Sequence, residues 1–174
     1  MKTNELIKIY NQIKNIKYKI VDIDYSLESS YDLINSNGAS CTPKHIILSD
    51  KFNQLGFQSR FCIYEFNWSD LNFEYPNRLS KLLKIFSSDF HTNLEVKIRD
   101  RWVMVDATWD NELIDAGMTG TKEWNGKDST LNAVKPIKTY KFNSIREKND
   151  FLKTEANETI EFIEKKVEFI NESQ

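Results

Sequence analysis

Two short strand-like runs, at 94–98 and 102–106, constrain the fold more than any other feature of the chain. The first alternates apolar and charged residues, and the second is apolar up to Asp106, with valines at 103 and 105, as in strands that bury one face. A tight turn at Arg99-Asp100 would pair Ile98 with Arg101. It would also gather five apolar side chains on one face, namely Leu94, Val96, Ile98, Val103 and Val105. The sequence therefore predicts an antiparallel hairpin over 91–106, because a one-residue slip would scatter that face.

Helical periodicity and strand-like runs surround the hairpin. The predicted helices are 4–15, a short helix through Ile34 capped by Ser26 or Ser29, a central helix from near Cys41 to Gly56, and an amphipathic helix from about 145 to 170. The other predicted strands are 18–23, 57–66 and 136–142, with irregular segments at 67–90 and 110–135. This pattern predicts an α+β fold in which helices pack on an antiparallel sheet.

Composition narrows the classes of function. The chain has 174 residues and a formal net charge of −2, which predicts a single domain over 1–174 that binds neither nucleic acid nor a membrane surface. The chain has no run of about 18 apolar residues, so we expect no transmembrane helix. Residues 1–5 do not resemble a signal peptide. We therefore expect a cytoplasmic protein with two reduced cysteines and no cofactor.

Three residues in separate segments have the chemistry of an activated cysteine nucleophile. Cys41 precedes an apolar helical run, His91 opens the first strand of the hairpin, and Asp106 ends the second. In the predicted register Asn93 lies opposite Asp106, so His91 and Asp106 are diagonal neighbours on one face, roughly 7–8 Å apart at the backbone. A thiol, an imidazole and a carboxylate in these positions predict acyl-transfer chemistry at an amide.

The start of a helix suits Cys41 for this role. Free backbone N–H groups and the positive end of the helix dipole stabilise a thiolate there. The Cys41 backbone N–H is also a candidate donor to the oxyanion of a tetrahedral intermediate. Tyr25 and Tyr31 are both candidates for a second donor, and the sequence does not choose between them.

These residues stand in segments that resemble the transglutaminase-like superfamily. The resemblance covers about 30–110 and consists of NGASC at 37–41, an apolar helix, LGFQSR at 55–60, HTNLEV at 91–96 and WVMVDATW at 102–109. It implies a papain-like fold with a Cys41–His91–Asp106 triad and a thioester intermediate. The acyl group would come from a peptide or protein amide, and its acceptor would be water or an amine. Two positions depart from the family, because two residues separate Gly38 from Cys41 and Thr92-Asn93 follows His91 where Ala-Trp is frequent.

Other interpretations remain open at this point. Cys41, His45, Cys62 and His91 could converge on zinc, although their spacing is unlike that of structural zinc sites; we expect no metal, a buried His45 and a Cys62 in the core. An arylamine N-acetyltransferase is a related alternative, for which the chain is short. A transglutaminase-like domain without activity that binds peptide or protein is the alternative from another class. The candidate substrate-binding residues are Trp68, Tyr75 and Trp109.

Overall fold

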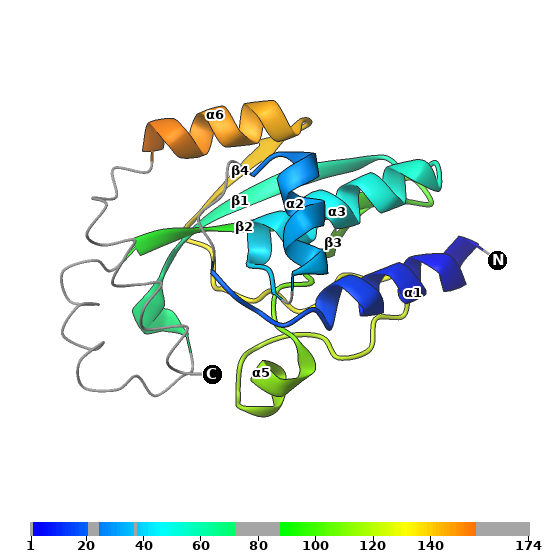
Figure 1. The fold of residues 1–174 in the computed structure, drawn as a ribbon, viewed down its shortest axis with the longest axis horizontal. Helices are drawn as coiled ribbons and strands as arrows, with labels where there is room; N and C mark the ends of the chain where they lie inside the picture. Colours follow the sequence, from blue (N-terminus) through cyan, green and yellow to red (C-terminus); the bar gives the residue numbers. More distant parts are fainter. Residues whose placement is uncertain (1, 21–24, 37, 72–87, 156–174) are drawn as a thin grey trace.

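A four-stranded antiparallel sheet forms the centre of the molecule in the computed structural model, which describes residues 2–20, 25–36, 38–71 and 88–155. The strand order is β3-β2-β1-β4 (Figure 1). The strands are β1 (Ser59–Asn67), β2 (Ser88–Ile98), β3 (Arg101–Val105) and β4 (Lys138–Phe142). Every neighbouring pair runs antiparallel, so the α+β fold class expected from the sequence is confirmed.

The β2–β3 hairpin has the register that the apolar alternation predicted. Ile98 pairs with Arg101 and Leu94 pairs with Val105. Arg99 and Asp100 both have positive φ, of 49° and 63°, as the two central residues of a type I′ turn require. This turn matches the right-handed twist of the strands, although neither residue is the glycine or asparagine that usually occupies it.

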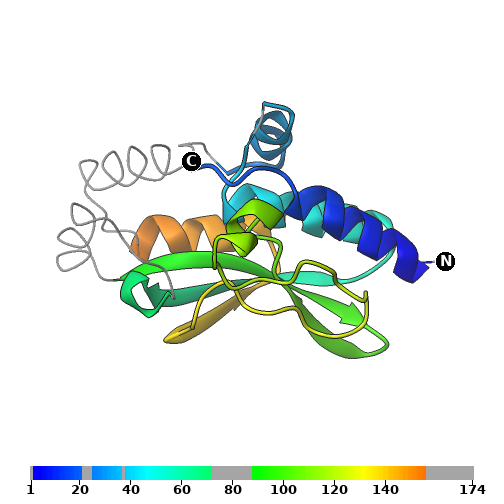
Figure 2. The same ribbon diagram turned by 90° about the horizontal axis from the view of Figure 1, so that it is seen from below.

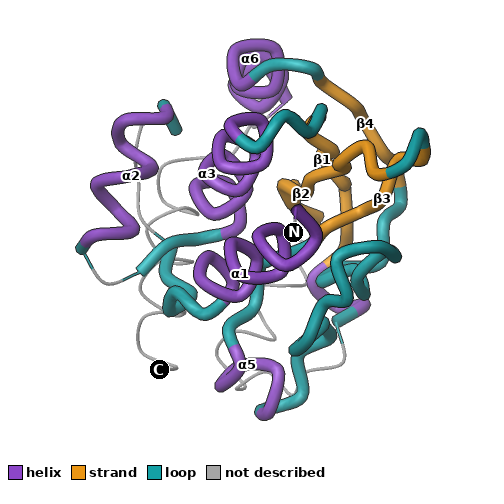
Figure 3. The backbone as a smooth tube through the Cα atoms, turned by 90° about the vertical axis from the view of Figure 1, so that its right-hand side faces the viewer, coloured by secondary structure: helices purple, strands orange, loops and turns teal. Residues whose placement is uncertain are grey.

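Helices cover one face of the sheet. Helices α1 (Lys2–Lys14) and α3 (Cys41–Gln54) lie against that face, and α2 (Leu27–Asn35) packs on the outer side of α3 (Figures 2 and 3). Their apolar side chains meet the inward-facing residues of the sheet in one core, made of Leu6, Tyr10, Ile13, Ile46, Ile47, Leu48, Phe52, Phe61, Leu94, Val96, Ile98, Val103, Val105, Ala107 and Trp124. Helix α6 (Ile145–Glu155) packs beside β4 and β1.

Local sequence sets both ends of α3. Ser40 has the extended backbone of an N-cap residue, with φ −77° and ψ −176°, so Cys41 is the first helical residue. At the other end Gly56 has φ +84°, and the Phe57 amide donates to the Phe52 carbonyl. A glycine in the left-handed region is the usual means of satisfying the last carbonyls of a helix. The helix that presents Cys41 therefore begins and ends as its sequence predicts.

Several elements differ from the sequence prediction. Strand β2 begins at Ser88 rather than 91, a single turn of 3-10 helix covers Trp68–Asp70, and α5 (Asn111–Asp115) interrupts the irregular segment at 110–135. Residues 18–20 are irregular rather than a strand. The rest of that predicted strand, the helix beyond 155 and Tyr75 lie outside the described residues. In the described part of the chain, no helix has the length and apolar character needed to cross a membrane.

Candidate active site

The end of β3 creates the space in which the three candidate catalytic residues meet. Strand β3 stops at Val105, whereas its partner β2 continues past Leu94 to Ser88, so β3 does not cover residues 88–93 of β2. The N-terminus of α3 lies against this part of β2, where the Thr42 and Thr92 hydroxyls are hydrogen-bonded at 2.8 Å. Cys41, the first residue of α3, is thereby placed beside His91 and Thr92.

Asp106 is the residue that orients His91. The His91 Nε2–H donates to Asp106 Oδ2 at 3.0 Å, and both side chains are buried. Because Nε2 is engaged by the carboxylate, Nδ1 is the ring nitrogen left to face the Cys41 thiol, whose pKa the neighbouring imidazole lowers. The three groups thus lie in the order thiol, imidazole, carboxylate, and a hydrogen bond joins the imidazole to the carboxylate.

The pKa values of Cys41 and His91 are shifted in opposite directions. Burial alone would lower the pKa of His91, but the charge and hydrogen bond of Asp106, with a contribution from Cys41, raise that pKa to about 10. Burial alone would raise the pKa of Cys41, but the hydrogen bond and charge of His91 and a backbone hydrogen bond from Thr92 lower it below its ordinary value. A raised imidazole pKa beside a lowered thiol pKa favours the thiolate–imidazolium form near neutral pH.

Backbone amides hold the Asp106 carboxylate in place. Oδ2 also accepts from the Ala133 amide at 2.8 Å and from Asn93 Nδ2 at 3.4 Å, while Oδ1 accepts from the Thr108 amide at 3.0 Å. Burial would raise the pKa of Asp106, but the charge and hydrogen bond of His91 keep that pKa well below the usual range. The carboxylate therefore stays ionised although water scarcely reaches it.

His45 lies near the other carboxylate oxygen of Asp106, with Nε2 3.8 Å from Oδ1, and is held by backbone groups. Its Nδ1–H donates to the Cys41 carbonyl at 2.8 Å, and its Nε2 accepts from the Ala107 amide at 3.0 Å. Burial lowers the pKa of His45 to about 4, against the charge of Asp106, so the ring is neutral. This side chain joins the first turn of α3 to the chain that follows Asp106.

Tyr18 is the neighbour of Cys41 that the sequence analysis missed. A short backbone bridge holds it, in which the Ala39 amide donates to the Lys17 carbonyl at 2.9 Å and the Lys19 amide donates to the Ala39 carbonyl at 3.3 Å. Its own amide donates to Asp110 at 2.8 Å, and its ring packs on Trp109 with centroids 4.6 Å apart. Burial and the charge of Cys41 both raise the pKa of Tyr18 well above its usual value. No local pattern marks this residue, because its supports come from 39 and 109–110.

The residues expected to bind substrate or an oxyanion have varied surroundings. The Tyr31 hydroxyl donates to Asp50 at 2.7 Å, which engages its hydrogen, and the Tyr25 carbonyl accepts from Asn149 on α6. Trp68 is half-buried, and its indole donates to Asp89 at 3.1 Å. Trp109 is buried under Tyr18, and its N–H has no acceptor in the described part of the chain. Tyr75 is outside the described residues.

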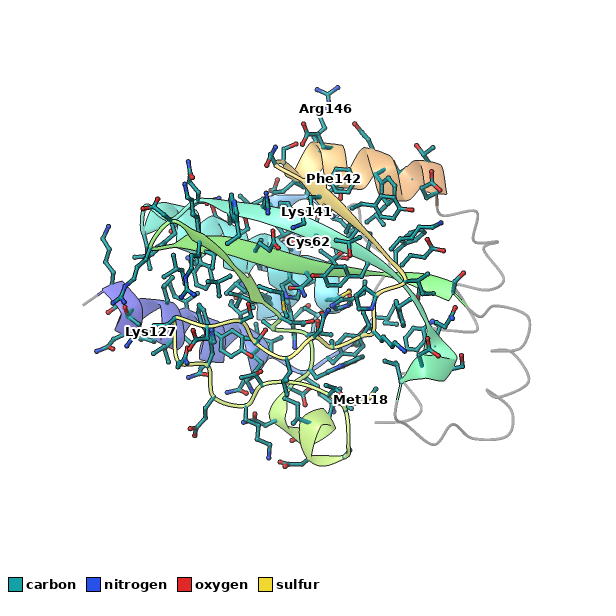
Figure 4. All side chains as sticks on the ribbon, turned by 180° about the vertical axis from the view of Figure 1, so that it is seen from behind. Cys62, Met118, Lys127, Lys141, Phe142 and Arg146 are labelled. Atoms are coloured by element: carbon teal, nitrogen blue, oxygen red, sulfur yellow. The ribbon has the colours of Figure 1, made fainter. Side chains whose placement is uncertain are left out.

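The second cysteine and the zinc hypothesis can be judged from the side-chain contacts. Cys62, in β1, is buried on the face of the sheet that Figure 4 looks onto, opposite Lys141 of β4. Burial and the neighbouring Glu95 raise the pKa of the Cys62 thiol to about 12. Both ring nitrogens of His45 are taken by backbone groups, so neither is left for a metal. Within the described ranges, no three His, Cys, Asp or Glu side chains are grouped to hold a metal ion.

Comparison with protein-family models, with curated proteins and with solved structures found no match to this chain. What the chain can do must therefore be argued from the site itself. A half-buried thiol at a helix N-terminus, beside a charged imidazole that a buried carboxylate orients, can attack an electrophilic carbonyl carbon.

Proposed function

We propose that this protein is a cysteine-dependent enzyme that transfers the acyl group of a peptide or protein amide, as the resemblance to the transglutaminase-like superfamily implies. The observation that supports it most is the His91–Asp106 hydrogen bond beside the Cys41 thiol, whose pKa His91 lowers. A papain-like arrangement, with the cysteine at the start of a helix that packs on an antiparallel sheet, belongs to the same proposal. The observed α3 and the β1–β3 sheet are compatible with it.

The chemistry requires one proton carrier and no cofactor. The Cys41 thiolate forms a bond to the amide carbonyl carbon, and the carbonyl electron pair moves to oxygen. When the tetrahedral intermediate collapses, the carbon–nitrogen bond breaks and the leaving amine takes a proton from His91, which leaves a thioester and a neutral imidazole. Water or a primary amine then gives its proton to His91 as it attacks the thioester, and the thiolate is released.

Two donors would stabilise the oxyanion in this mechanism. The first is the backbone N–H of Cys41, which has no intrahelical partner at the first position of α3. The second is the Tyr18 hydroxyl, which we assign in place of Tyr25 or Tyr31 because Tyr18 is fixed beside Cys41 by the backbone of Ala39. Tyr18→Phe should lower kcat for amide substrates by about 10²-fold, the usual loss for one oxyanion donor. It should leave alkylation of Cys41 within about threefold of the wild type, because alkylation forms no oxyanion.

The first test is the reactivity of the two thiols, which needs no knowledge of the substrate. Cys41 should react with iodoacetamide at neutral pH at least about 10²-fold faster than Cys62, since the thiolate is the reacting form. Mass spectrometry of the digested protein measures both rates in one sample. Equal rates would contradict the proposal.

The second test is turnover of a panel of peptide amides, with and without an added primary amine. Cys41→Ala should abolish any activity found, by several orders of magnitude, while Cys62→Ala, the matched control, should keep it. Product masses distinguish the two acceptors, because hydrolysis yields a free carboxylate and transamidation yields a new amide. A reactive Cys41 without turnover on any peptide, together with saturable peptide binding, would favour the inactive binding domain instead.

A further inference from the structure

Lys44 lies one turn after Cys41 on α3, and its whole side chain is buried. Its Nζ donates to two main-chain carbonyls, that of Lys14 at 3.0 Å and that of Thr108 at 2.9 Å. Lysine is almost never fully buried without a specific partner. The burial of Lys44 therefore has to be explained by its two partners, both of which lie outside α3.

The two carbonyls belong to segments far apart in the sequence. Lys14 is the last residue of α1, so its carbonyl has no partner within the helix. Thr108 follows Asp106 by two residues, and its amide donates to Asp106 Oδ1 at 3.0 Å. Lys44 thus connects the helix that carries Cys41 to Thr108, and Thr108 in turn is hydrogen-bonded to Asp106.

The charges around Lys44 come from three elements. The carboxylate of Asp110 and the groups of Cys41 and Asp106 favour its ammonium form, whereas Lys14 opposes it. Burial is the largest influence and lowers the pKa of Lys44 to about 7. Two carbonyl acceptors satisfy the two N–H groups of the neutral amine, so the connection persists in either protonation state.

We propose that Lys44 is a positioning residue for the candidate site, which fixes Asp106, and through it His91, relative to Cys41. The inference rests on the proposed function. Without Lys44 the Thr108 carbonyl would be buried without a donor, and the loop that follows β3 would be tied to α3 only through the Ala107 amide and His45. Asp106 would then hold His91 less firmly, and the thiolate of Cys41 would be less favoured.

A second buried lysine provides a matched control. Lys148 of α6 is also fully buried and also interacts with the charge of Cys41, and burial lowers its pKa to about 8. Its Nζ donates to Asn149 and lies over the rings of Tyr25 and Phe61, so it has no part in the connection to Thr108. Removing either lysine deletes a charge near Cys41, but only Lys44 holds the Asp106 loop.

The experiment measures the iodoacetamide rate of Cys41 across pH in folded protein, with circular dichroism as the folding control. Lys44→Met should raise the alkylation pKa of Cys41 by about one unit and slow alkylation at neutral pH by about tenfold. Lys44→Arg, which keeps the donors, should restore the rate to within about threefold, and Lys148→Met should change it by less than about threefold. In an Asp106→Asn background, Lys44→Met should have less than about a twofold further effect, because both changes act through one carboxylate. If Lys44→Met does not fold, Lys44→Gln is measured against the same expectations.

The outcomes separate the two proposals. If wild-type Cys41 is no faster than Cys62, the proposed function fails and the role of Lys44 fails with it. If wild-type Cys41 is fast and Lys44→Met leaves it so, only the role of Lys44 is overturned. Equal slowing by Lys44→Met and Lys148→Met, or full additivity with Asp106→Asn, would also overturn it, since either result would reduce Lys44 to a nearby charge.

Discussion

The two histidines of this chain are both buried beside one carboxylate, yet one ring is neutral and the other is charged. Their rings lie 6.2 Å apart and approach Asp106 at 3.0 Å from His91 and 3.8 Å from His45. Burial disfavours the charged form of both rings, and Asp106 favours it in both. The pKa is nevertheless lowered to about 4 in His45 and raised to about 10 in His91.

The difference lies in what the second nitrogen of each ring contacts. His45 Nε2 accepts from the Ala107 amide, and an acceptor nitrogen cannot carry a proton. His91 instead donates to the carboxylate and lies beside an ionisable thiol, and both groups stabilise the imidazolium. Burial alone therefore does not decide the charge of a histidine; the donors and acceptors around the ring decide it. In this site a neutral ring supports the backbone, while a charged ring is available for proton transfer.

Removing the charged ring should have the largest effect. His91→Ala should slow alkylation of Cys41 at neutral pH by about 30-fold or more, because a thiol of ordinary pKa is only a few per cent thiolate at pH 7. Any amide turnover should fall by about 10³-fold or more. The iodoacetamide rate measures the first effect, and His45→Gln is the control, which should keep the rate within about threefold. An unchanged rate in His91→Ala would mean that His91 does not activate the thiol.

Removing the shared carboxylate should have the next largest effect and should reduce the difference between the two rings. Asp106→Asn removes the charge that raises the pKa of His91, so this pKa should fall, the thiolate should be less favoured, and alkylation at neutral pH should slow by about tenfold. Thermal melting checks that the variant is folded. If the His91 pKa stays high in Asp106→Asn, the carboxylate is not its cause.

The pH dependence tests the comparison directly, because the chain has only two histidines. Imidazole NMR resonances should show one ring titrating near pH 4 and the other near pH 10, and a transition near the ordinary value of 6.5 would contradict the assignment. A lowered histidine pKa contributes stability that is present above 6.5 and is lost as the pH falls towards 4. His45→Gln should reduce that loss of melting temperature, while costing about 1–3 kcal/mol at neutral pH through the disturbed backbone hydrogen bonds.

The smallest effect is expected at the edge of the carboxylate. Asn93 Nδ2 is 3.4 Å from Asp106 Oδ2 and also donates to Asn132 at 3.0 Å, so it is a secondary partner of the charge. Asn93→Ala should slow alkylation of Cys41 by less than about threefold and cost about 0.5–1.5 kcal/mol of stability. Urea denaturation measures the second quantity. If Asn93→Ala slowed alkylation as much as Asp106→Asn does, Asn93 rather than the Ala133 amide would hold the carboxylate.

Patterns among residues close together in the sequence were enough to predict much of the secondary structure and strand pairing. The apolar alternation predicted the pairing of Ile98 with Arg101, and Gly56 marked the end of α3. The same parity placed His91 and Asp106 on one face of the hairpin, where the structure joins them at 3.0 Å. The predictions were less accurate where sequence pattern is weak, as at the early start of β2 at Ser88 and the short helix α5.

What the sequence determined by itself was therefore the residues with reactive side chains and the elements that carry them, because strand parity and helix caps depend on neighbours a few positions away. The tertiary structure decided which of these groups are charged and what holds them. The neutral state of His45 depends on the amide of Ala107, 62 residues further along the chain, and the role inferred for Lys44 depends on the carbonyl of Thr108, 64 residues further. Every residue other than proline has a backbone amide, and every residue has a carbonyl, so residue type does not identify these partners. Only the folded chain brings each one to the side chain whose charge or position it sets.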